Sequence, residues 1–368
     1  MDTCDVLIVG GGPAGSACAW ALGRAGLDVV VVDRATFPRD KVCAGWITPQ
    51  VVDELELDTN EYRKGRTFQA FTGFRVGLVD GDRTVETRYE APVSFGIRRC
   101  EFDAYLLRRS GARLLLGEPA TSIVRDNQHW VVNDAVRAPM LVGAGGHFCP
   151  VARAVNPEHA RPATQLVVAQ EAEFELDPDD EAASPTAHEM PELYFCRELD
   201  GYGWRVRKGN YVNIGIGRLD CRLLPPTVAR FVNFLERTGR LSHHAGRRWH
   251  GHAYLVSAPI ARRTLGDGVL LAGDAAGLAW PQSGEGIRPA IQSGLFAAQT
   301  IVDAAGRYTR GRLHRYDTWL REKFAASPVV RALSPLVPAT VWMPLARRLL
   351  GNRAFVRSVV LNRGFLRP

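Results

Sequence analysis

The sequence lacks any apolar run of the roughly 18 residues that a membrane-spanning helix needs. Its opening residues, Met1–Asp5, lack the basic segment that begins a secretory signal peptide. The seven cysteines are scattered, odd in number and never spaced as CxxC, which argues against a disulfide framework and a structural zinc site. We therefore expect a cytoplasmic protein with reduced thiols and no bound metal.

Acidic residues are missing from the end of the chain. From Lys323 to Pro368 there is no Asp or Glu but there are eight Lys and Arg, so the first 322 residues carry a net charge of −1 and the tail accounts for the total of +7. A neutral body argues against a uniformly basic nucleic-acid-binding protein, and no helix-turn-helix or aromatic-basic groove pattern favours one. We expect no nucleic-acid partner.

The remaining composition is that of a globular protein. With 46% hydrophobic residues in 368, the chain can bury sizeable cores, and its length favours two domains. An apolar run at Asp5–Val9, a small-residue helix at 14–25 and a β-branched run at Asp28–Asp33 predict a βαβ unit with a parallel sheet. Paired strands are expected further on, at Leu193–Cys196, Gly203–Val206 and Tyr211–Gly217.

The first βαβ unit carries a dinucleotide fingerprint. Gly10-x-Gly12-x-x-Gly15 opens the helix, and Asp33 ends the next strand 23 residues after Gly10. The glycines allow a tight turn and a close approach of a pyrophosphate to the helix N-terminus, while the acid accepts from ribose hydroxyls. The predicted cofactor contacts here are Gly10, Gly12, Pro13, Ala14, Gly15, Asp33 and Arg34.

A second motif decides between a flavin and a nicotinamide dinucleotide. Val269–Gly277 followed by Gly284–Ile287 and a helix resembles the second FAD fingerprint of the para-hydroxybenzoate-hydroxylase-like flavoproteins. The resemblance implies that Asp274 binds the ribityl chain and that the helix start faces the flavin pyrimidine, where a positive helix end stabilises a reduced, anionic flavin. The implied contacts are Gly273, Asp274, Gly284, Gly286 and Ile287.

Arg99-x-x-Phe102-Asp103 resembles a third element of that superfamily, whose Arg reaches the FAD phosphates or the flavin edge. Phe37–Trp46 and Gly201–Trp204 resemble segments of the geranylgeranyl reductase branch, which implies that Lys41 and Ala44 also contact the cofactor.

Three further residues are candidates for the substrate site. Strand alternation places Tyr202 and Trp204 on one face, which would form an aromatic wall, and Arg205 and Arg207 on the other. Cys43 is either a thiol that gates or protonates beside a reduced flavin or a buried structural cysteine.

Two departures from the family patterns bear on the reaction. The branch usually reads Tyr-x-Trp-x-Phe-Pro, whereas Arg205-Val206-Arg207 stands here, and the two arginines would admit an anionic group. Gly145 stands where the hydroxylases carry an acid, which argues against an NADPH-fed hydroxylase. The Trp-x-Trp-x-Ile-Pro signature of flavin halogenases is also missing, so halogenation is not expected.

The tail and a histidine group allow two interpretations each. The apolar and basic residues after Leu333 fit either an interfacial helix that contacts membrane lipid or a helical cap on the chain's own core. His243, His244, His250 and His252 lack the acid or thiol that a metal site would need, and a solvated strand and turn is favoured.

These patterns together predict an α/β protein with a Rossmann-like FAD-binding domain, an inserted antiparallel β-rich substrate domain and a helical C-terminal region. The expected boundaries are 1–65, 92–155 and 262–305 for the first, 66–91 and 156–261 for the second, and 306–368 for the cap.

The resemblance implies an FAD-dependent oxidoreductase that reduces C=C bonds of a small apolar, isoprenoid-like substrate. Its external electron donor would be NAD(P)H or a reduced carrier protein. A flavin monooxygenase of an aromatic or polycyclic metabolite and a non-catalytic flavin-binding or electron-transfer protein are the alternatives.

Overall fold

The computed structural model describes residues 1–157, 166–176, 189–241, 248–255, 262–280, 283–324 and 339–366, with the side chains of 339–342 left out. The chain divides into two compact units, each built from three segments. The first unit comprises Met1–Asp40, Cys100–Leu166 and Tyr254–Ala326, and the second comprises Lys41–Arg99, Val167–Ala253 and Ser327–Pro368.

These boundaries differ from the expected ones. Residues 41–65 and 92–99 fall in the second unit because strands β4 (Trp46–Ile47), β8 (Ser94–Gly96) and β5 (Gln69–Phe71) pair into one small sheet. The predicted cap at 306–368 is divided between the units: helix α9 (Arg310–Phe324) belongs to the first, where the Tyr316 hydroxyl donates to the Leu271 carbonyl.

A six-stranded sheet forms the centre of the first unit. Its order is β19-β20-β13-β2-β3-β9, parallel except for the edge strand β19. The central strands are short aliphatic runs buried on both faces, as parallel strands must be when helices cover both sides. Their bounds are Leu265–Gly266 (β19), Val269–Leu271 (β20), Met140–Gly143 (β13), Val6–Val9 (β2), Val29–Asp33 (β3) and Arg113–Leu116 (β9).

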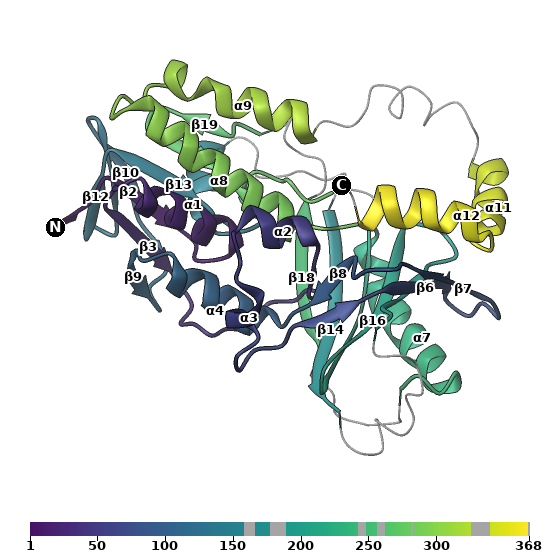
Figure 1. The fold of residues 1–368 in the computed structure, drawn as a ribbon. Coiled ribbons are helices and arrows are strands. Elements are labelled where there is room, and N and C mark those ends of the chain that lie inside the picture. Colours follow the sequence, from purple (N-terminus) through teal and green to yellow (C-terminus); the bar gives the residue numbers. More distant parts are fainter. Residues whose placement is uncertain are drawn as a thin grey trace. The chain divides into compact units, whose positions relative to one another are not determined.

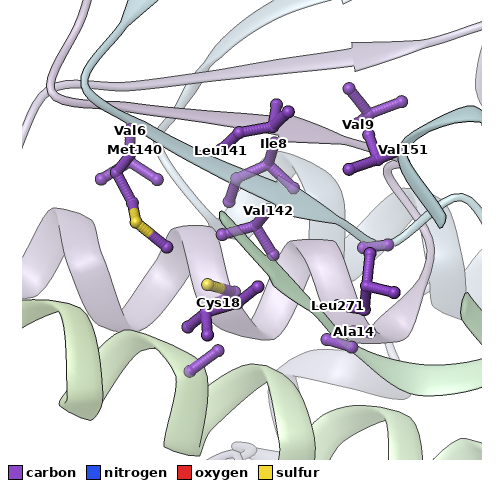
Figure 2. Close-up of a cluster of buried hydrophobic side chains, with 14 of the residues drawn as sticks. Val6, Ile8, Val9, Ala14, Cys18, Met140, Leu141, Val142, Val151 and Leu271 are labelled. Atoms are coloured by element: carbon purple, nitrogen blue, oxygen red, sulfur yellow. The ribbon is translucent and has the colours of Figure 1, made fainter. Parts of the chain in front are cut away.

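Helices α1 (Pro13–Arg24) and α8 (Ile287–Ala304) lie side by side against this sheet (Figure 1). Small residues permit the close approach, since a Cβ at Gly294 would stand 2.2 Å from the Ala14 carbonyl oxygen. Figure 2 shows Ala14 and Cys18 of α1 packed among Val142 and Leu271 of the strands.

Shorter elements complete the first unit. They are helices α4 (Arg99–Arg109, whose first residue falls in the second unit) and α5 (Pro150–Val155), the 3₁₀ turn η3 (Gly273–Ala275), and a four-stranded sheet of β1 (Asp2–Thr3), β12 (Val136–Ala138), β11 (His129–Val132) and β10 (Ile123–Asp126).

A seven-stranded, mainly antiparallel sheet dominates the second unit, which confirms the β-rich prediction. Its order is β18-β14-β17-β16-β15-β6-β7, and β15 runs parallel to β6. The bounds are His250–Leu255 (β18), Leu166–Glu175 (β14), Tyr211–Arg218 (β17), Gly201–Lys208 (β16), Glu192–Phe195 (β15), Gly73–Leu78 (β6) and Thr84–Arg88 (β7). The helices are α2 (Pro49–Glu54), α3 (Thr59–Tyr62), the 3₁₀ turn η2 (Cys221–Leu223), α7 (Leu224–Arg237), α11 (Ala339–Leu349), α12 (Arg353–Phe355) and the π-helix η4 (Val356–Phe365).

The two faces of this sheet are covered by different helices (Figure 1). Phe231 of α7 packs against Gly203, while Val356, Leu361 and Phe365 of η4 pack with Trp204 on the other face. The predicted alternation along β16 is therefore confirmed. Part of the tail forms a cap on its own unit, one of the two interpretations that the sequence allowed.

None of the helices in the described part of the chain is both long enough and apolar enough to cross a membrane.

Candidate functional site

The dinucleotide turn has the predicted strand–turn–helix geometry. Gly10 adopts φ +115°, and a Cβ there would stand 2.4 Å from the Ala144 carbonyl carbon at the end of the neighbouring strand β13. Strands β2 and β13 flank the point where the strand order reverses, which is where open α/β sheets bind ligands. The N-cap of α1, Gly12, has no side-chain cap, so the first N–H groups of the helix are available to a phosphate.

Asp33 ends β3 beside this turn. Its Oδ2 accepts from the Gly11 N–H at 2.7 Å, and its Oδ1 accepts from the Ala35 N–H at 2.9 Å. Each carboxylate oxygen keeps a further lone pair, so the half-buried acid can still accept from a ribose hydroxyl. Arg34 is exposed next to it, and its contact with the cofactor stays a prediction.

The second glycine-rich segment also adopts special backbone conformations. Gly273 has φ +61° and donates its N–H to Ser293 Oγ of α8 at 2.9 Å. Gly284 has φ +66°, and a Cβ there would lie 2.3 Å from the Tyr254 hydroxyl.

The start of α8 is shaped in the same way as the start of α1. Gly286 is its N-cap, again without a side-chain cap, and a Cβ at Gly286 would lie 3.3 Å from Asp274 Oδ1. Glycine is thus the N-cap of two helices in one unit, before Pro13 and before Ile287, where the positive end of the helix dipole favours a negatively charged group.

The structure adds Arg39, which our sequence prediction of the cofactor contacts missed. Its Nη2 lies 3.1 Å from the carboxylate of Asp103, a fully buried residue, and its guanidinium stacks on the Phe37 ring. A Cβ at Gly12 would meet Nη2 at 3.6 Å, so the guanidinium borders the dinucleotide turn. Its other nitrogen, Nη1, is buried and has no hydrogen-bond partner among the described residues.

These features fit FAD. A crowded glycine turn, an uncapped helix end and a buried, unsatisfied guanidinium nitrogen meet the needs of a pyrophosphate. Asp33 suits a ribose, and Asp274 with the α8 N-terminus suits the ribityl chain and flavin. Bound FAD would supply two-electron chemistry, and these residues would bind and orient it.

Replacing Arg39 with methionine is expected to weaken FAD binding about 10- to 100-fold, because a charge-assisted hydrogen bond contributes about 1.5–3 kcal/mol. Titration of the apoprotein with FAD, followed by flavin fluorescence, measures the change. Arg108→Met, on the exposed face of α4 in the same unit, is the control and should bind FAD normally. An unchanged dissociation constant for Arg39→Met would remove Arg39 from the site.

The remaining candidates lie in the second unit, where their cofactor contacts stay predictions. Lys41 Nζ lies 2.6 Å from His252 Nε2, and the Ala44 carbonyl accepts from Lys208 Nζ at 3.2 Å. Cys43 is half-buried, and its N–H donates to Glu171 Oε2 at 2.7 Å. Arg99 is buried at the start of α4.

The predicted aromatic wall is present but largely covered by the chain itself. Trp204 is 6% exposed and donates its Nε1–H to Asn213 Oδ1 at 2.6 Å. Tyr202 packs edge-to-face on Phe365 of η4, with ring centroids 5.2 Å apart.

The two arginines of β16 are buried on the opposite face, where they hold backbone carbonyls. Arg205 donates to the Arg240 carbonyl, and Arg207 donates to that of Gly209. The expectation that they admit an anionic group has no support in this arrangement.

A buried ionic cluster, which sequence reasoning did not detect, lies beside Cys43. Lys208 is fully buried at the end of β16, and its ammonium contacts Glu173 Oε2 at 2.5 Å and the Ile97 carbonyl at 3.1 Å. Burial alone would raise the pKa of Glu173, but Lys208 and Arg98 outweigh that effect and hold it below its ordinary value. Burial raises the pKa of Glu171 to about 7.

No group of three or more residues suited to hold a metal ion occurs within the described ranges. His250 and His252 lie on β18, while His243 and His244 lie outside the residues that the structure describes.

Comparisons with known proteins support the cofactor assignment. The family model described as FAD dependent oxidoreductase matches residues 5–79. A geranylgeranyl bacteriochlorophyll reductase-like protein from Thermoplasma acidophilum has a similar structure, with a TM-score of 0.79, 20% identity and coverage of 100% of this chain and 98% of that one. A flavin-dependent brominase is similar at a TM-score of 0.72, with 18% identity and coverage of 97% and 92%. At these identities the two structures show the fold alone.

Two curated relatives have higher sequence identity. Digeranylgeranylglycerophospholipid reductase from Methanothrix thermoacetophila is 29% identical over 321 residues, which cover 82% of this chain and 78% of that protein. Menaquinone reductase from Mycobacterium tuberculosis is 30% identical over 326 residues, which cover 82% of this chain and 77% of that protein. The chain therefore belongs to the family of FAD-dependent oxidoreductases that includes this menaquinone reductase.

Proposed function

We propose that the protein reduces C=C bonds of an apolar, isoprenoid-like lipid. The observation that carries the proposal is the alignment, over most of the chain, with reductases named for menaquinone and for a digeranylgeranyl phospholipid. In such a reaction one alkene carbon receives a hydride and the other a proton, while the reduced cofactor is oxidised. The electron donor in this proposal is NAD(P)H or a reduced carrier protein.

The second unit supports an apolar substrate through its aromatic residues. Trp46 lies with its ring centroid 6.1 Å from that of Phe74 and 6.2 Å from that of Phe365, on the same sheet face as Tyr202. Side chains of η4 already cover part of this face, and the rings of Trp46 and Tyr202 stay partly exposed, where they would bind hydrocarbon by excluding water.

Anaerobic reduction of the holoprotein, followed by reoxidation with a panel of polyprenyl and aromatic compounds, tests the proposal. We expect a polyprenyl compound to reoxidise the flavin and to gain two hydrogens per saturated bond, as read by mass analysis. In a second arm oxygen is admitted to the reduced protein together with each compound, and oxygen insertion with a transient C4a-adduct absorbance there would establish a monooxygenase instead. Reoxidation that is independent of every compound would favour a non-catalytic flavoprotein.

We further propose that the tail makes peripheral contact with anionic lipid. While its apolar side packs on the sheet, Arg348, Arg353 and Arg357 are exposed, as are Leu345 (57%) and Val359 (42%). Basic side chains beside exposed aliphatic ones are typical of a surface that lies against headgroups.

Neutralising Arg348, Arg353 and Arg357 with glutamine should weaken co-sedimentation with anionic liposomes roughly 100-fold, at about 1 kcal/mol for each charge. The control neutralises three exposed arginines of the first unit, Arg108, Arg310 and Arg312. Equal binding by both variants would contradict the contact. Deleting the tail is a poorer test, because it also removes Val356, Leu361 and Phe365 from the core.

A further inference from the structure

Three buried side chains hold the main chain of residues 41–45, here called the Cys43 loop. Glu171 Oε2 accepts from the Cys43 N–H at 2.7 Å, and Asn213 Nδ2 donates to the Cys43 carbonyl at 3.3 Å. Lys208 Nζ donates to the next carbonyl, that of Ala44, at 3.2 Å. The three side chains come from strands β14, β17 and β16, and together they form what we call the clamp.

The clamp fits the loop closely. Gly45 adopts φ +71°, and a Cβ there would stand 2.5 Å from Lys208 Nζ and 2.4 Å from the Ile97 carbonyl oxygen. The Gly45 N–H in turn lies 3.4 Å from Cys43 Sγ, as a donor to that sulfur. The loop and the clamp are therefore in close contact, although residues 41–45 have no regular secondary structure.

Burying this much charge is costly, since each buried ion loses several kcal/mol of solvation. Apolar side chains would stabilise the sheet at lower cost, so packing alone does not account for the charged groups. Lys208 and Asn213 each direct a hydrogen-bond donor at a loop carbonyl, and Glu171 directs an acceptor at the loop amide. The charge of the clamp is thus directed at the Cys43 loop.

Glu171 can change its charge near neutral pH. Burial raises its pKa to about 7, against the opposing effects of the Cys43 amide and Lys208, and Glu173 on the same strand raises it further. Other charged groups of the surrounding elements include Arg98, which pairs with Glu173, and the Lys41–His252 pair, whose histidine is on β18. Glu175 is exposed at the end of β14, and the two arginines of β16 lie on the opposite face of the sheet. Glu171 Oε1 makes no hydrogen bond to the described part of the chain and is therefore the oxygen at which a proton would reside.

We propose that Glu171 is a positioning residue for Cys43. Glu171 holds the loop tightly when its carboxyl is ionised and loosely when the carboxyl is protonated. The reason is that an ionised carboxylate is a stronger acceptor than a neutral carboxyl, by about a factor of two. Only the placement of Cys43 at the substrate site rests on the proposed function. The restraint on the loop is independent of turnover.

Amide hydrogen exchange of the full-length holoprotein, read by mass spectrometry for peptides that contain Cys43, tests the proposal between pH 6 and pH 8. After correction for intrinsic exchange, protection of the Cys43 amide should rise about three- to tenfold as pH increases, with a midpoint near 7. Glu171→Gln, which keeps an oxygen acceptor but carries no charge, should show weak protection at every pH. Glu175→Gln, at an exposed site on the same face of β14, should behave as the wild type.

Two further variants distinguish the Glu171 carboxyl from the Cys43 thiol as the titrating group. Cys43→Ser removes the thiol, and this variant should retain the pH dependence of amide protection. If the pH dependence disappears in Cys43→Ser, the thiol is the titrating group and the proposal is overturned. If Glu171→Gln does not fold, Glu171→Asp keeps the charge but withdraws it by one methylene, and it should lower protection at pH 8 at least threefold.

Wild-type protection that does not change with pH would also overturn the proposal. Because the exchange experiment needs no substrate, that result would not contradict the proposed reductase activity. Failure of the reduction assay would likewise not contradict the role of the clamp.

Discussion

Replacing Gly15 with alanine is expected to abolish stable FAD binding. The new Cβ would stand 1.9 Å from the Gly10 carbonyl oxygen and 3.2 Å from Ile8 Cγ2, so helix α1 would have to move away from the turn. The helix cannot do so alone, because Gly294 of α8 packs directly on the Ala14 carbonyl. In active sites a misplacement of about 1 Å costs on the order of 100-fold in rate. By analogy, we expect a comparable or larger loss of FAD affinity here.

The flavin absorbance of the purified protein, and titration of the apoprotein with FAD, measure this effect. Gly23→Ala is the matched control in the same helix: its Cβ would meet only the Ser110 carbonyl at 3.4 Å, and alanine is favoured over glycine in a helix by up to about 1 kcal/mol. The control should bind FAD normally and be slightly more stable. Gly15→Ala protein that retains wild-type flavin content would contradict the close packing of the turn.

Replacing Lys208 with methionine should destabilise the second unit by about 3–5 kcal/mol. Removing one partner of a buried ion pair leaves the other charge without compensation, and here both Glu171 and Glu173 lose their buried cation. Adding Glu173→Gln to this variant should restore part of the stability. Hydrogen exchange in β16 and β17 measures the loss, since a two-unit chain need not unfold in one step.

The loss should also grow with pH. Without Lys208 the pKa of Glu171 rises further above about 7, so the folded state binds protons that the unfolded state has already released. Stability from such a raised carboxyl is complete below its ordinary pKa and disappears as pH rises through the folded value. Lys208→Met should therefore be less damaging at pH 6 than at pH 8, and Lys64→Met, at an exposed site, should have little effect at either. A loss of equal size at both pH values would show that the packing of the Lys208 side chain, and not its charge, stabilises the unit.

The sequence of the tail did not distinguish a helix that contacts membrane lipid from a cap on the chain's own core. Apolar residues such as Leu361 and Phe365 alternate with arginines, and this pattern is the same whether the apolar side meets lipid or protein. Only the packing of η4 with Trp204 assigns the apolar side to the sheet of the second unit. The liposome experiment tests the proposed contact of the exposed arginines with anionic lipid.

Features that depend on a short stretch of backbone could be predicted from the sequence. The turn at Gly10 needs a positive φ that glycine adopts readily, and the faces of β16 follow from the two-residue period of a strand, so both appear in local sequence. Gly273 and Gly284 also adopt a positive φ, which is a local property that glycine in the sequence already indicates. For this reason the sequence by itself determined the fold class, the cofactor and the family.

Features that depend on long-range contacts were decided only by the tertiary structure. Arg39 acquires its orientation from Asp103, 64 positions later in the chain, and Cys43 is held by Glu171, 128 positions away. An isolated Arg or Glu in a sequence is ordinarily solvated, and nothing local indicates that folding will bury it. The guanidinium nitrogen of Arg39, which has no partner among the described residues, and the carboxyl of Glu171, whose pKa burial raises to about 7, owe these properties to the fold. The fold removes water from groups that the sequence presents as ordinary surface charges.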